Sequence, residues 1–215
     1  MSFANPIRHT NPRARRIRAS HQRREASAMR VIAGEAHGRR MRAPRGLQTR
    51  PATARVRASI FSRLAARIDF EEVRVLDLFA GSGSLGLEAL SRGAGWAVFV
   101  DSSRAAISAI RDNLNALGLT TRAEVIVADV ERALAALAAR GERFDLVFVD
   151  APYRKDVSAA VLAALESRRL IGAGACVVVR QARRAPEINP TGLEAINRAT
   201  LGDHRIALYR AAATR

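Results

Sequence analysis

Residues 73–86, Val-Arg-Val-Leu-Asp-Leu-Phe-Ala-Gly-Ser-Gly-Ser-Leu-Gly, decide the fold of this chain. The segment 73–79 is apolar apart from one arginine and Asp77, which is typical of a strand buried on both faces of a parallel sheet. Glycines follow at positions 81, 83 and 86, where a helical pattern begins. The spacing therefore predicts a strand, a glycine turn and a helix, a unit that brings backbone N–H groups up to a ligand.

Asp77 narrows the choice of ligand. The glycine spacing also fits the G-x-G-x-x-G fingerprint of dinucleotide-binding proteins, so the glycines alone do not discriminate between ligands. A carboxylate just before the turn suits a cationic ligand and would repel a pyrophosphate. We therefore expect a ligand that presents positive charge to this turn.

The composition indicates one globular domain. The chain has 215 residues, of which 48% are hydrophobic, enough for a substantial core. Cys176 is the only cysteine, so no intrachain disulfide can form and a reducing compartment is expected. No apolar run approaches the ~18 residues of a membrane span, and residues 1–28 lack the apolar stretch of a signal peptide. We expect a cytoplasmic protein, with a monomer as the default oligomeric state.

Positive charge is concentrated at the N-terminus. Residues 1–60 hold 15 arginines and two acids, whereas residues 61–215 hold 21 basic and 18 acidic residues. This segregation indicates a polyanionic partner. Residues 1–28, with seven arginines and no periodicity, are predicted to be a basic disordered tail. Residues 29–52 are predicted to form a basic hairpin around a turn at His37.

After residue 52 the pattern predicts alternating helices and strands. Thr53 can cap a helix that runs to about Arg67 and buries Val56, Ile60, Phe61 and Leu64, with Arg55 and Arg57 pointing elsewhere. The further elements are strands at 96–100, 123–128, 144–149 and 175–179, helices at 103–117, 130–141 and 157–170, and two final strands near 193–200 and 205–209. Such alternation requires a parallel sheet with helices on both faces.

Four acids follow four of the predicted strands: Asp77, Asp101, Asp129 and Asp150. Each alone could be a helix cap, but ligands of open α/β sheets bind at the carboxyl ends of the strands. Together with the glycine turn, the four acids predict one crevice. Asp101 stands 20 residues beyond Gly81, where an acid can accept hydrogen bonds from both ribose hydroxyls of a nucleoside cofactor. The four histidines are scattered, so no metal site is expected.

Three segments resemble a known family. Residues 77–86 resemble motif I of class I S-adenosylmethionine (SAM) methyltransferases, and residues 150–153, Asp-Ala-Pro-Tyr, resemble their motif IV, (Asp/Asn)-Pro-Pro-(Tyr/Phe). The segment 50–57 is similar to an Arg-Pro-Thr-x-x-Arg-x-Arg element, with alanine in place of the threonine. From about Met29 to Tyr209 the chain resembles the bacterial small-subunit (16S) ribosomal RNA guanine-N2 methyltransferases, the RsmD-like family. Met29 matches the usual family N-terminus, so residues 1–28 are either a real extension or follow from a start codon assigned too early.

The resemblance implies a Rossmann-like class I methyltransferase fold: a mostly parallel seven-stranded sheet with helices on both faces and an antiparallel terminal strand. Residues 53–215 would form this domain. The implied cofactor is SAM, bound by Asp77, Phe79, Ala80, Gly81, Gly83, Asp101, Ser102, Asp129 and Val130. The implied partner is ribosomal RNA, free or within an assembling small subunit, contacted by Arg39, Arg40, Arg50, Arg55 and Arg57.

The resemblance also assigns the chemistry. Asp150 and the backbone carbonyl at Ala151 would accept the two N–H bonds of a guanine amine, which is a poor nucleophile because its lone pair is delocalised. Pro152 would stiffen the loop, and Tyr153 would stack on an extruded base. Proline is usual at position 151, so the loop of this chain is expected to be looser. Arg180, where relatives often carry an acid, receives no role.

Three other functions remain open from the sequence. The same constellation would serve the N6 amine of adenine in DNA or RNA. The glycine spacing permits a nicotinamide-dependent oxidoreductase, although Asp77 and residues 150–153 argue against it. Finally, Ala151 could mark a nucleic-acid-binding protein that has lost catalysis.

Overall fold

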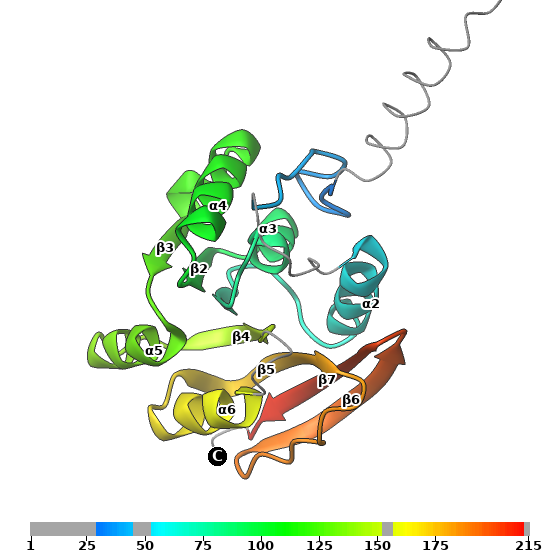
Figure 1. Cartoon of the computed structure of the whole chain (residues 1–215), viewed down its shortest axis with the longest axis vertical. Helices are drawn as coiled ribbons and strands as arrows, with labels where there is room; N and C mark the ends of the chain where they lie inside the picture. Colours follow the sequence, from blue (N-terminus) through cyan, green and yellow to red (C-terminus); the bar gives the residue numbers. More distant parts are fainter. Residues whose placement is uncertain (1–28, 45–52, 152–156, 213–215) are drawn as a thin grey trace, which may run out of the picture.

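A seven-stranded sheet forms the centre of the molecule (Figure 1). The computed structural model describes residues 29–44, 53–151 and 157–212, so the predicted tail at 1–28 lies outside the described residues. The strands are β1 (Arg74–Leu78), β2 (Trp96–Asp101), β3 (Ala123–Val127), β4 (Phe144–Val149), β5 (Ile171–Ala182), β6 (Leu193–Leu201) and β7 (His204–Ala211). The helices are α2 (Ala54–Ala65), α3 (Ser84–Ser91), α4 (Arg104–Leu117), α5 (Val130–Ala139) and α6 (Ser158–Ser167), with a short 3-10 turn at Thr120–Arg122.

The strand order is β3-β2-β1-β4-β5-β7-β6. Strands β1 to β5 are parallel to their neighbours, and β7 is antiparallel to both β5 and β6. The chain adds β2 and β3 on one side of β1 and then returns to place β4 and β5 on the other. The switch point, where open α/β sheets bind ligands, therefore lies between β1 and β4. The predicted sheet and its antiparallel terminal strand are confirmed.

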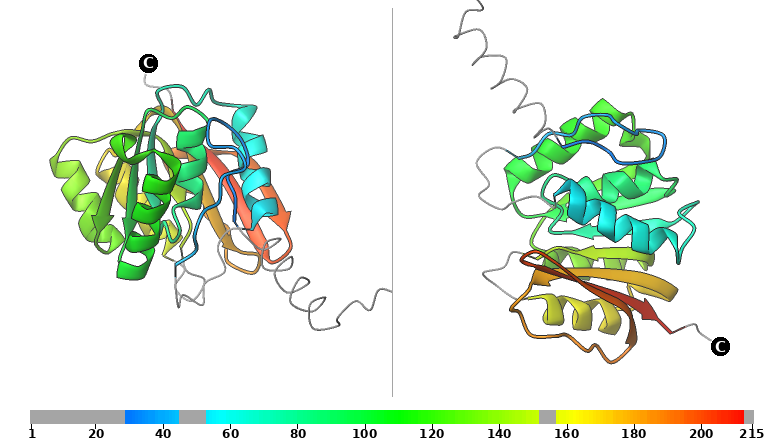
Figure 2. Two further views of the ribbon diagram at one scale, coloured as in Figure 1. Left: turned by 90° about the horizontal axis from the view of Figure 1, so that it is seen from above. Right: turned by 90° about the vertical axis from the view of Figure 1, so that its right-hand side faces the viewer.

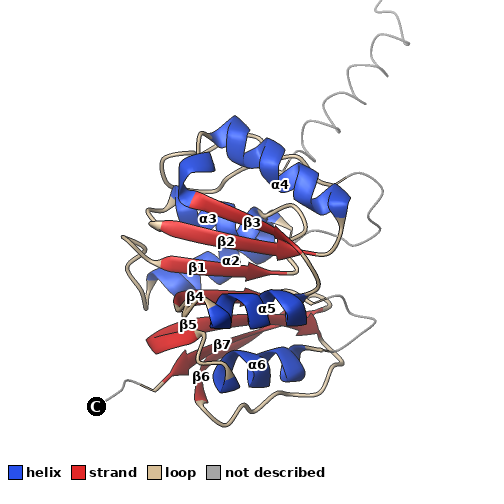
Figure 3. Cartoon of the chain, turned by 90° about the vertical axis from the view of Figure 1, so that its left-hand side faces the viewer, coloured by secondary structure: helices blue, strands red, loops and turns tan. Residues whose placement is uncertain are grey.

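Helices cover both faces of the sheet (Figures 2 and 3). On one face α2, α3 and α4 pack on side chains such as Val75, Leu146 and Phe148. On the other face α5 and α6 pack on the alternate residues of the same strands, such as Leu76 and Val147. Because successive side chains of a strand point to opposite faces, strands buried on both sides read as the nearly continuous apolar runs seen in the sequence.

Side-chain caps set the helix starts that the sequence predicts. The side chains of Thr53, Ser103 and Asp129 accept hydrogen bonds from Val56 N, Ala106 N and Arg132 N at the first turns of α2, α4 and α5. Each cap satisfies one of the backbone donors that a helix start leaves without an intrahelical partner. Gly118 caps the end of α4, and its φ of 75° is the left-handed conformation that glycine adopts at low cost.

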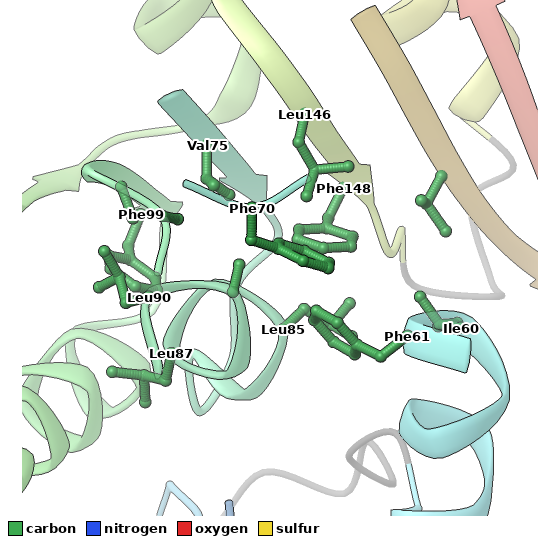
Figure 4. Packing of buried hydrophobic residues seen from close by; sticks show 14 of the residues in the cluster. Ile60, Phe61, Phe70, Val75, Leu85, Leu87, Leu90, Phe99, Leu146 and Phe148 are labelled. Atoms are coloured by element: carbon green, nitrogen blue, oxygen red, sulfur yellow. The ribbon is translucent and has the colours of Figure 1, made fainter. Parts of the chain in front are cut away.

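Aromatic side chains fill the space between α2 and the sheet (Figure 4). Phe61 of α2 is fully buried, and its ring centroid lies 5.8 Å from those of both Phe70 and Phe148. The Arg92 guanidinium lies over the Phe61 ring at 4.8 Å. Tilted aromatic pairs and a stacked cation each add specific geometry to the burial of apolar area, so α2 is fixed to the domain.

The segment 29–44 packs against α3 and α4 as part of the domain (Figure 1). Val31, Ala36 and Met41 belong to the same buried cluster as the sheet residues. The predicted hairpin is present as one antiparallel bridge between Arg30 and Arg40 around a turn, whereas residues 45–52 lie outside the described residues. The core therefore extends across the predicted boundary at residue 53.

The buried carboxylate of Glu88 fixes this segment to α3. Its two oxygens accept hydrogen bonds from Ile32 N (2.8 Å) and Ala33 N (3.0 Å), and Arg92 pairs with it at 2.9 Å. The Ser91 hydroxyl donates to Ala33 O and accepts from Ala36 N. These contacts satisfy backbone groups of a segment with little secondary structure of its own.

The largest differences from the predicted bounds are in β5 and α6. Strand β5 begins at Ile171, four residues earlier than predicted, and its register with β4 shifts between Phe144 and Leu146. Gly174, with φ of 71°, lies at this irregularity. The helix predicted for 157–170 is shorter, ending at Ser167. None of the helices in the described ranges has the length and apolarity needed to cross a membrane.

Candidate active site

The glycine loop after β1 forms the floor of the candidate site. Ala80 N donates to Val100 O of β2, and Gly83 N donates to Ala80 O, which closes a tight turn. Gly81 and Gly83 have φ values of 57° and 75°, and Phe79 has the same left-handed φ of 57°. A left-handed non-glycine residue costs about 1 kcal/mol or more, and such strain clusters at functional sites. Contacts with the surrounding structure must therefore hold the loop in this strained conformation.

Asp77 lies beneath this loop with only 1% of its surface exposed. Its Oδ2 atom accepts a hydrogen bond from Gly86 N at 2.9 Å. Burial raises the pKa of Asp77 well above its usual range; the Gly86 hydrogen bond lowers it, and the charges of Asp150 and Asp101 raise it further. A cationic ligand over the loop would favour the ionised form. Direct contact of Asp77 with a ligand stays a prediction.

Gly86 allows α3 to approach the sheet closely. A Cβ atom at this position would lie 2.4 Å from Cε1 of Phe99 and 3.2 Å from Oδ2 of Asp77. Only glycine therefore permits both the packing of α3 on β2 and the hydrogen bond to Asp77. This is the role of the third glycine in a strand–turn–helix unit.

Asp101 ties the glycine loop to the end of β2. Its Oδ2 accepts from Gly81 N and its Oδ1 accepts from Ser103 N, both at 2.8 Å. Each carboxylate oxygen keeps a second lone pair, so the side chain can still accept ligand hydroxyls. Ser102, the next residue, is exposed.

Asp129 and Val130 lie at the end of β3, the neighbour of β2. Asp129 is exposed and caps α5 through its Oδ1 atom, while Val130 is 8% exposed. The structure thus places one polar and one apolar side chain at this edge. That Asp129 and Val130 contact the adenine ring of the cofactor stays a prediction.

Asp150 lies at the carboxyl end of β4, beside the end of β1, because these two strands pair in parallel. Arg180, two residues before the last residue of β5, forms a two-pronged ion pair with it: Nε to Oδ1 at 2.5 Å and Nη2 to Oδ2 at 2.7 Å. Ala151 is buried, whereas Pro152 and Tyr153 lie outside the described residues. The sequence interpretation gave Arg180 no role, although the charged residue ending the apolar run 175–179 was a visible signal.

The predicted RNA-contacting arginines fall into two groups. Arg39, Arg40 and Arg55 are exposed, and Arg39 also donates to the Leu117 and Ala116 carbonyls at the end of α4. A cation there complements the negative end of the helix dipole. Arg50 lies outside the described residues.

Arg57 was predicted wrongly to point away from the domain. It is 1% exposed, its Nη2 atom donates to Arg30 O at 2.6 Å, and burial lowers its pKa, an effect that the nearby charge of Glu88 opposes. The side chain therefore joins α2 to the segment 29–44 and does not reach the surface. We do not retain it as an RNA contact.

Asn113 of α4 connects the segment 29–44 to the glycine loop, a contact that sequence reasoning missed. Its amide donates to Arg42 O and Ser82 O, and its Oδ1 atom accepts from Arg42 N. Asn113 and Ser82 are both buried. The geometry of the loop thus depends on residues far away in the sequence.

The donor and acceptor set fits S-adenosylmethionine better than a dinucleotide. Asp77, Asp101 and Asp150 lie near enough that the charges of the last two act on the first. Three acids around one loop suit a ligand with a sulfonium, an ammonium and ribose hydroxyls, and would repel a pyrophosphate. Among the described residues, no group of three or more His, Cys, Asp or Glu side chains could hold a metal ion.

The sequence of this chain matches a family profile described as "Conserved hypothetical protein 95" over residues 29–210. The chain belongs to this family. A Bacillus subtilis protein described as a candidate rRNA methyltransferase is 38% identical over 183 residues, or 85% of this chain and 98% of that protein. Ribosomal RNA small subunit methyltransferase D of Escherichia coli is 36% identical over 151 residues, or 70% and 73% of the two chains.

A solved structure agrees with the family assignment. An Escherichia coli protein described as a methyltransferase superposes with a TM-score of 0.74 at 32% identity, and the match covers 86% of this chain and 99% of that one. The matched family region begins at Met29 and so includes the segment that packs on α3 and α4. This member of the Conserved hypothetical protein 95 family is therefore a Rossmann-like class I methyltransferase, as the sequence resemblance predicted.

Proposed function

We propose that this protein transfers a methyl group from S-adenosylmethionine to the exocyclic N2 amine of a guanine in small-subunit (16S) ribosomal RNA. The proposal rests on one observation above all: Asp150 ends β4 directly beside β1, whose glycine loop follows Leu78. A hydrogen-bond acceptor thus lies next to the loop that suits the methyl donor. The small-subunit rRNA methyltransferase of Escherichia coli, at 36% identity, supports the substrate class.

The residues at the strand ends would hold the cofactor. When bound, S-adenosylmethionine supplies an electrophilic methyl group on a positively charged sulfur. Asp101 would accept hydrogen bonds from the ribose hydroxyls, and Asp129 and Val130 would meet the adenine. The backbone at Phe79, Ala80, Gly81 and Gly83 would hold the methionine end, with Ser102 at the rim and the buried charge of Asp77 favouring the cation.

Asp150 would hold the amine of the target base. Its carboxylate and the Ala151 carbonyl would accept the two N–H bonds, favour a pyramidal nitrogen and stabilise the positive charge that grows on it. The amine lone pair forms the new N–C bond while the electron pair of the S–C bond stays on sulfur, and the amine then loses a proton to water. Pro152 would stiffen the loop, and Tyr153 would stack on the extruded base.

Exposed arginines on the segment and the helix that precede the glycine loop support an RNA partner. Arg39, Arg40 and Arg55 lie on the segment and helix that precede the glycine loop, and the first 60 residues carry most of the net charge. Lys and Arg contacts to phosphates supply affinity without reading sequence. We further propose that the substrate is presented within an assembling small subunit, that one copy of the chain acts on it, and that this happens in the cytoplasm.

The test is methyl transfer by the wild type and by Asp150→Ala. Both proteins are incubated with labelled SAM and small subunits from a strain that lacks the enzyme, and the modified nucleoside is identified by mass spectrometry. We expect N2-methylguanine from the wild type and a loss of turnover of ~100-fold or more in Asp150→Ala, because the amine loses its acceptor. SAM binding by titration calorimetry should stay within about threefold, since the cofactor contacts lie elsewhere.

The matched control is Asp145→Ala, which removes an exposed acid at the opposite end of β4. This variant should keep wild-type turnover. Equal activity of Asp150→Ala and the wild type would refute the role of Asp150. N6-methyladenine as the product would instead identify an adenine methyltransferase, and binding of NAD in place of SAM would overturn the cofactor assignment.

A further inference from the structure

Arg180 has no assigned role, yet among the described residues it makes the closest charged contact to the proposed catalytic group. The parallel pairing of β4 and β5 sets Val149 opposite Val179, so Asp150, which follows β4, lies beside Arg180 of β5. The two side chains are 15% and 8% exposed. The arginine backbone is itself held in the sheet, where it pairs with Ile206 of β7.

The contact fixes the carboxylate in one orientation. Nε and Nη2 of Arg180 reach different oxygens of Asp150, at 2.5 and 2.7 Å. A planar guanidinium that binds both oxygens prevents the carboxylate from rotating about its last bond. A lysine could neutralise the charge but, as a single point donor, could not fix the plane.

The pairing also compensates the charge of Asp150. A largely buried carboxylate without a cation is destabilising by several kcal/mol. Arg180 supplies that cation, and each Asp150 oxygen keeps a further lone pair that can accept a hydrogen bond from a ligand.

We propose that Arg180 is the positioning residue of methyl transfer: it holds the plane of the Asp150 carboxylate so that the target amine is aligned with the methyl group. The inference rests on the proposed function of the site. Arg180 contacts Asp150, not the reacting atoms, and acts through it. Because misplacement of a reacting group by about 1 Å can cost ~100-fold in rate, a loss of this alignment should appear in turnover and not in binding.

Arg180→Lys is the first variant to measure, since it keeps the charge and removes the two-pronged geometry. We expect kcat to fall ~10- to 100-fold, with the KM for RNA and the Kd for SAM within about threefold of wild type. A purely structural role would instead lower the melting temperature and impair all three quantities. The matched control, Arg205→Lys on the neighbouring β7, replaces an arginine that donates to the Ala185 and Arg183 carbonyls, and it should leave kcat unchanged.

A double-mutant cycle shows whether Arg180 acts through Asp150. Arg180→Gln should lower kcat in the wild type but have no further effect in Asp150→Asn, because the residue that it positions has already lost its function. The double variant has no buried unpaired charge, so it should fold even if Arg180→Gln alone does not.

Two results would overturn the inference. Wild-type kcat in Arg180→Lys would show that the fixed plane does not matter. A fall caused by Arg180→Gln that is equally large with and without Asp150 would show that Arg180 acts independently. Failure of the proposed function has a different signature, since the wild type itself would then not methylate the RNA.

Discussion

Two acids at the ends of adjacent strands, Asp77 on β1 and Asp150 after β4, have opposite surroundings. Asp77 is 1% exposed, accepts a hydrogen bond from the backbone of Gly86, and has no cation in contact among the described residues. Asp150 has a side chain that is 15% exposed and is paired with the guanidinium of Arg180. The carboxyl edge of the sheet thus holds one carboxylate without a cation in contact and one that is paired with a guanidinium.

Because of this difference, the two acids suit two different tasks. An uncompensated acid below the glycine loop attracts a cation, which suits binding of a sulfonium cofactor. A neutralised and oriented acid attracts no cation but still accepts hydrogen bonds, which suits an amine that becomes positive only during the reaction. Two acids in one site can therefore have different roles because their surroundings differ.

Glu88 offers the strongest test of this comparison, because it combines backbone donors and a cation. Its fully buried carboxylate accepts from two backbone amides of the segment 29–44 and pairs with Arg92. We expect Glu88→Gln to lower the free energy of unfolding by ~3–5 kcal/mol, since a buried charge loses its partner. The melting temperature should fall by roughly 2–4 °C per kcal/mol, and amide exchange at Ile32 and Ala33 should accelerate.

Glu124→Gln is the control for that measurement. Glu124 pairs with Arg140 on the surface, where both side chains are partly exposed, and surface pairs are worth about 1 kcal/mol or less. If Glu88→Gln were no more destabilising than Glu124→Gln, the segment 29–44 would not depend on this carboxylate.

The substitution Gly86→Ala would displace the backbone N–H group that donates a hydrogen bond to Asp77. The new Cβ would overlap the Phe99 ring and crowd Asp77, so we expect a loss of about 1–3 kcal/mol in the free energy of unfolding and weaker SAM binding. Thermal melts and titration calorimetry measure the two effects. Gly172→Ala, whose Cβ would meet its neighbours at an ordinary 3.4 Å, should change neither. Unaltered SAM affinity in Gly86→Ala would argue that Asp77 binds the cofactor without the help of α3.

Of the three variants, Asp77→Asn should change the stability least, and it should raise the stability where Glu88→Gln and Gly86→Ala lower it. Because the folded pKa of Asp77 is raised, the folded protein holds this proton more tightly than the unfolded chain, and stability falls as pH rises above the usual pKa of about 4 toward the raised folded value. Asparagine removes this cost, so the variant should melt ~2–6 °C higher at neutral pH, with a smaller gain near pH 4. Its SAM affinity should fall.

The control variant for this prediction is Asp129→Asn. Asp129 is an exposed helix cap, and asparagine caps helices equally well, so its melting temperature should stay near that of the wild type. A melting temperature of Asp77→Asn below that of the wild type at pH 7 would mean that the Asp77 charge is compensated in the folded protein.

Local patterns in the sequence predicted most of the fold. Apolar runs located the parallel strands, and Thr53, Ser103 and Asp129 marked helix starts, because strand burial and helix capping depend on neighbouring residues. The acids at the strand ends followed from the same pattern. Three of the four, Asp77, Asp101 and Asp150, lie near one another as predicted from the shared carboxyl edge of the sheet. That Asp129 lines the same crevice stays a prediction.

Contacts between distant residues were not predictable in the same way. The bond from Ile32 N to Glu88 spans 56 positions, and that between Asp150 and Arg180 spans 30, so no short-range period reports them. Arg57 is a different case. Its spacing to residues 60, 61 and 64 places it on the buried face of α2, and only the assumption that arginine faces solvent hid this signal.

The packing of residues 29–44 limits how far the chain can be shortened. Val31, Ala36 and Met41 cover apolar side chains of α3 and α4, and the Glu88 carboxylate would keep its charge but lose its backbone donors if they were removed. A truncated version that starts at residue 53 would therefore expose an apolar patch around a carboxylate that has lost its two backbone donors and keeps only Arg92. It would accumulate in inclusion bodies instead of yielding a minimal catalytic fragment.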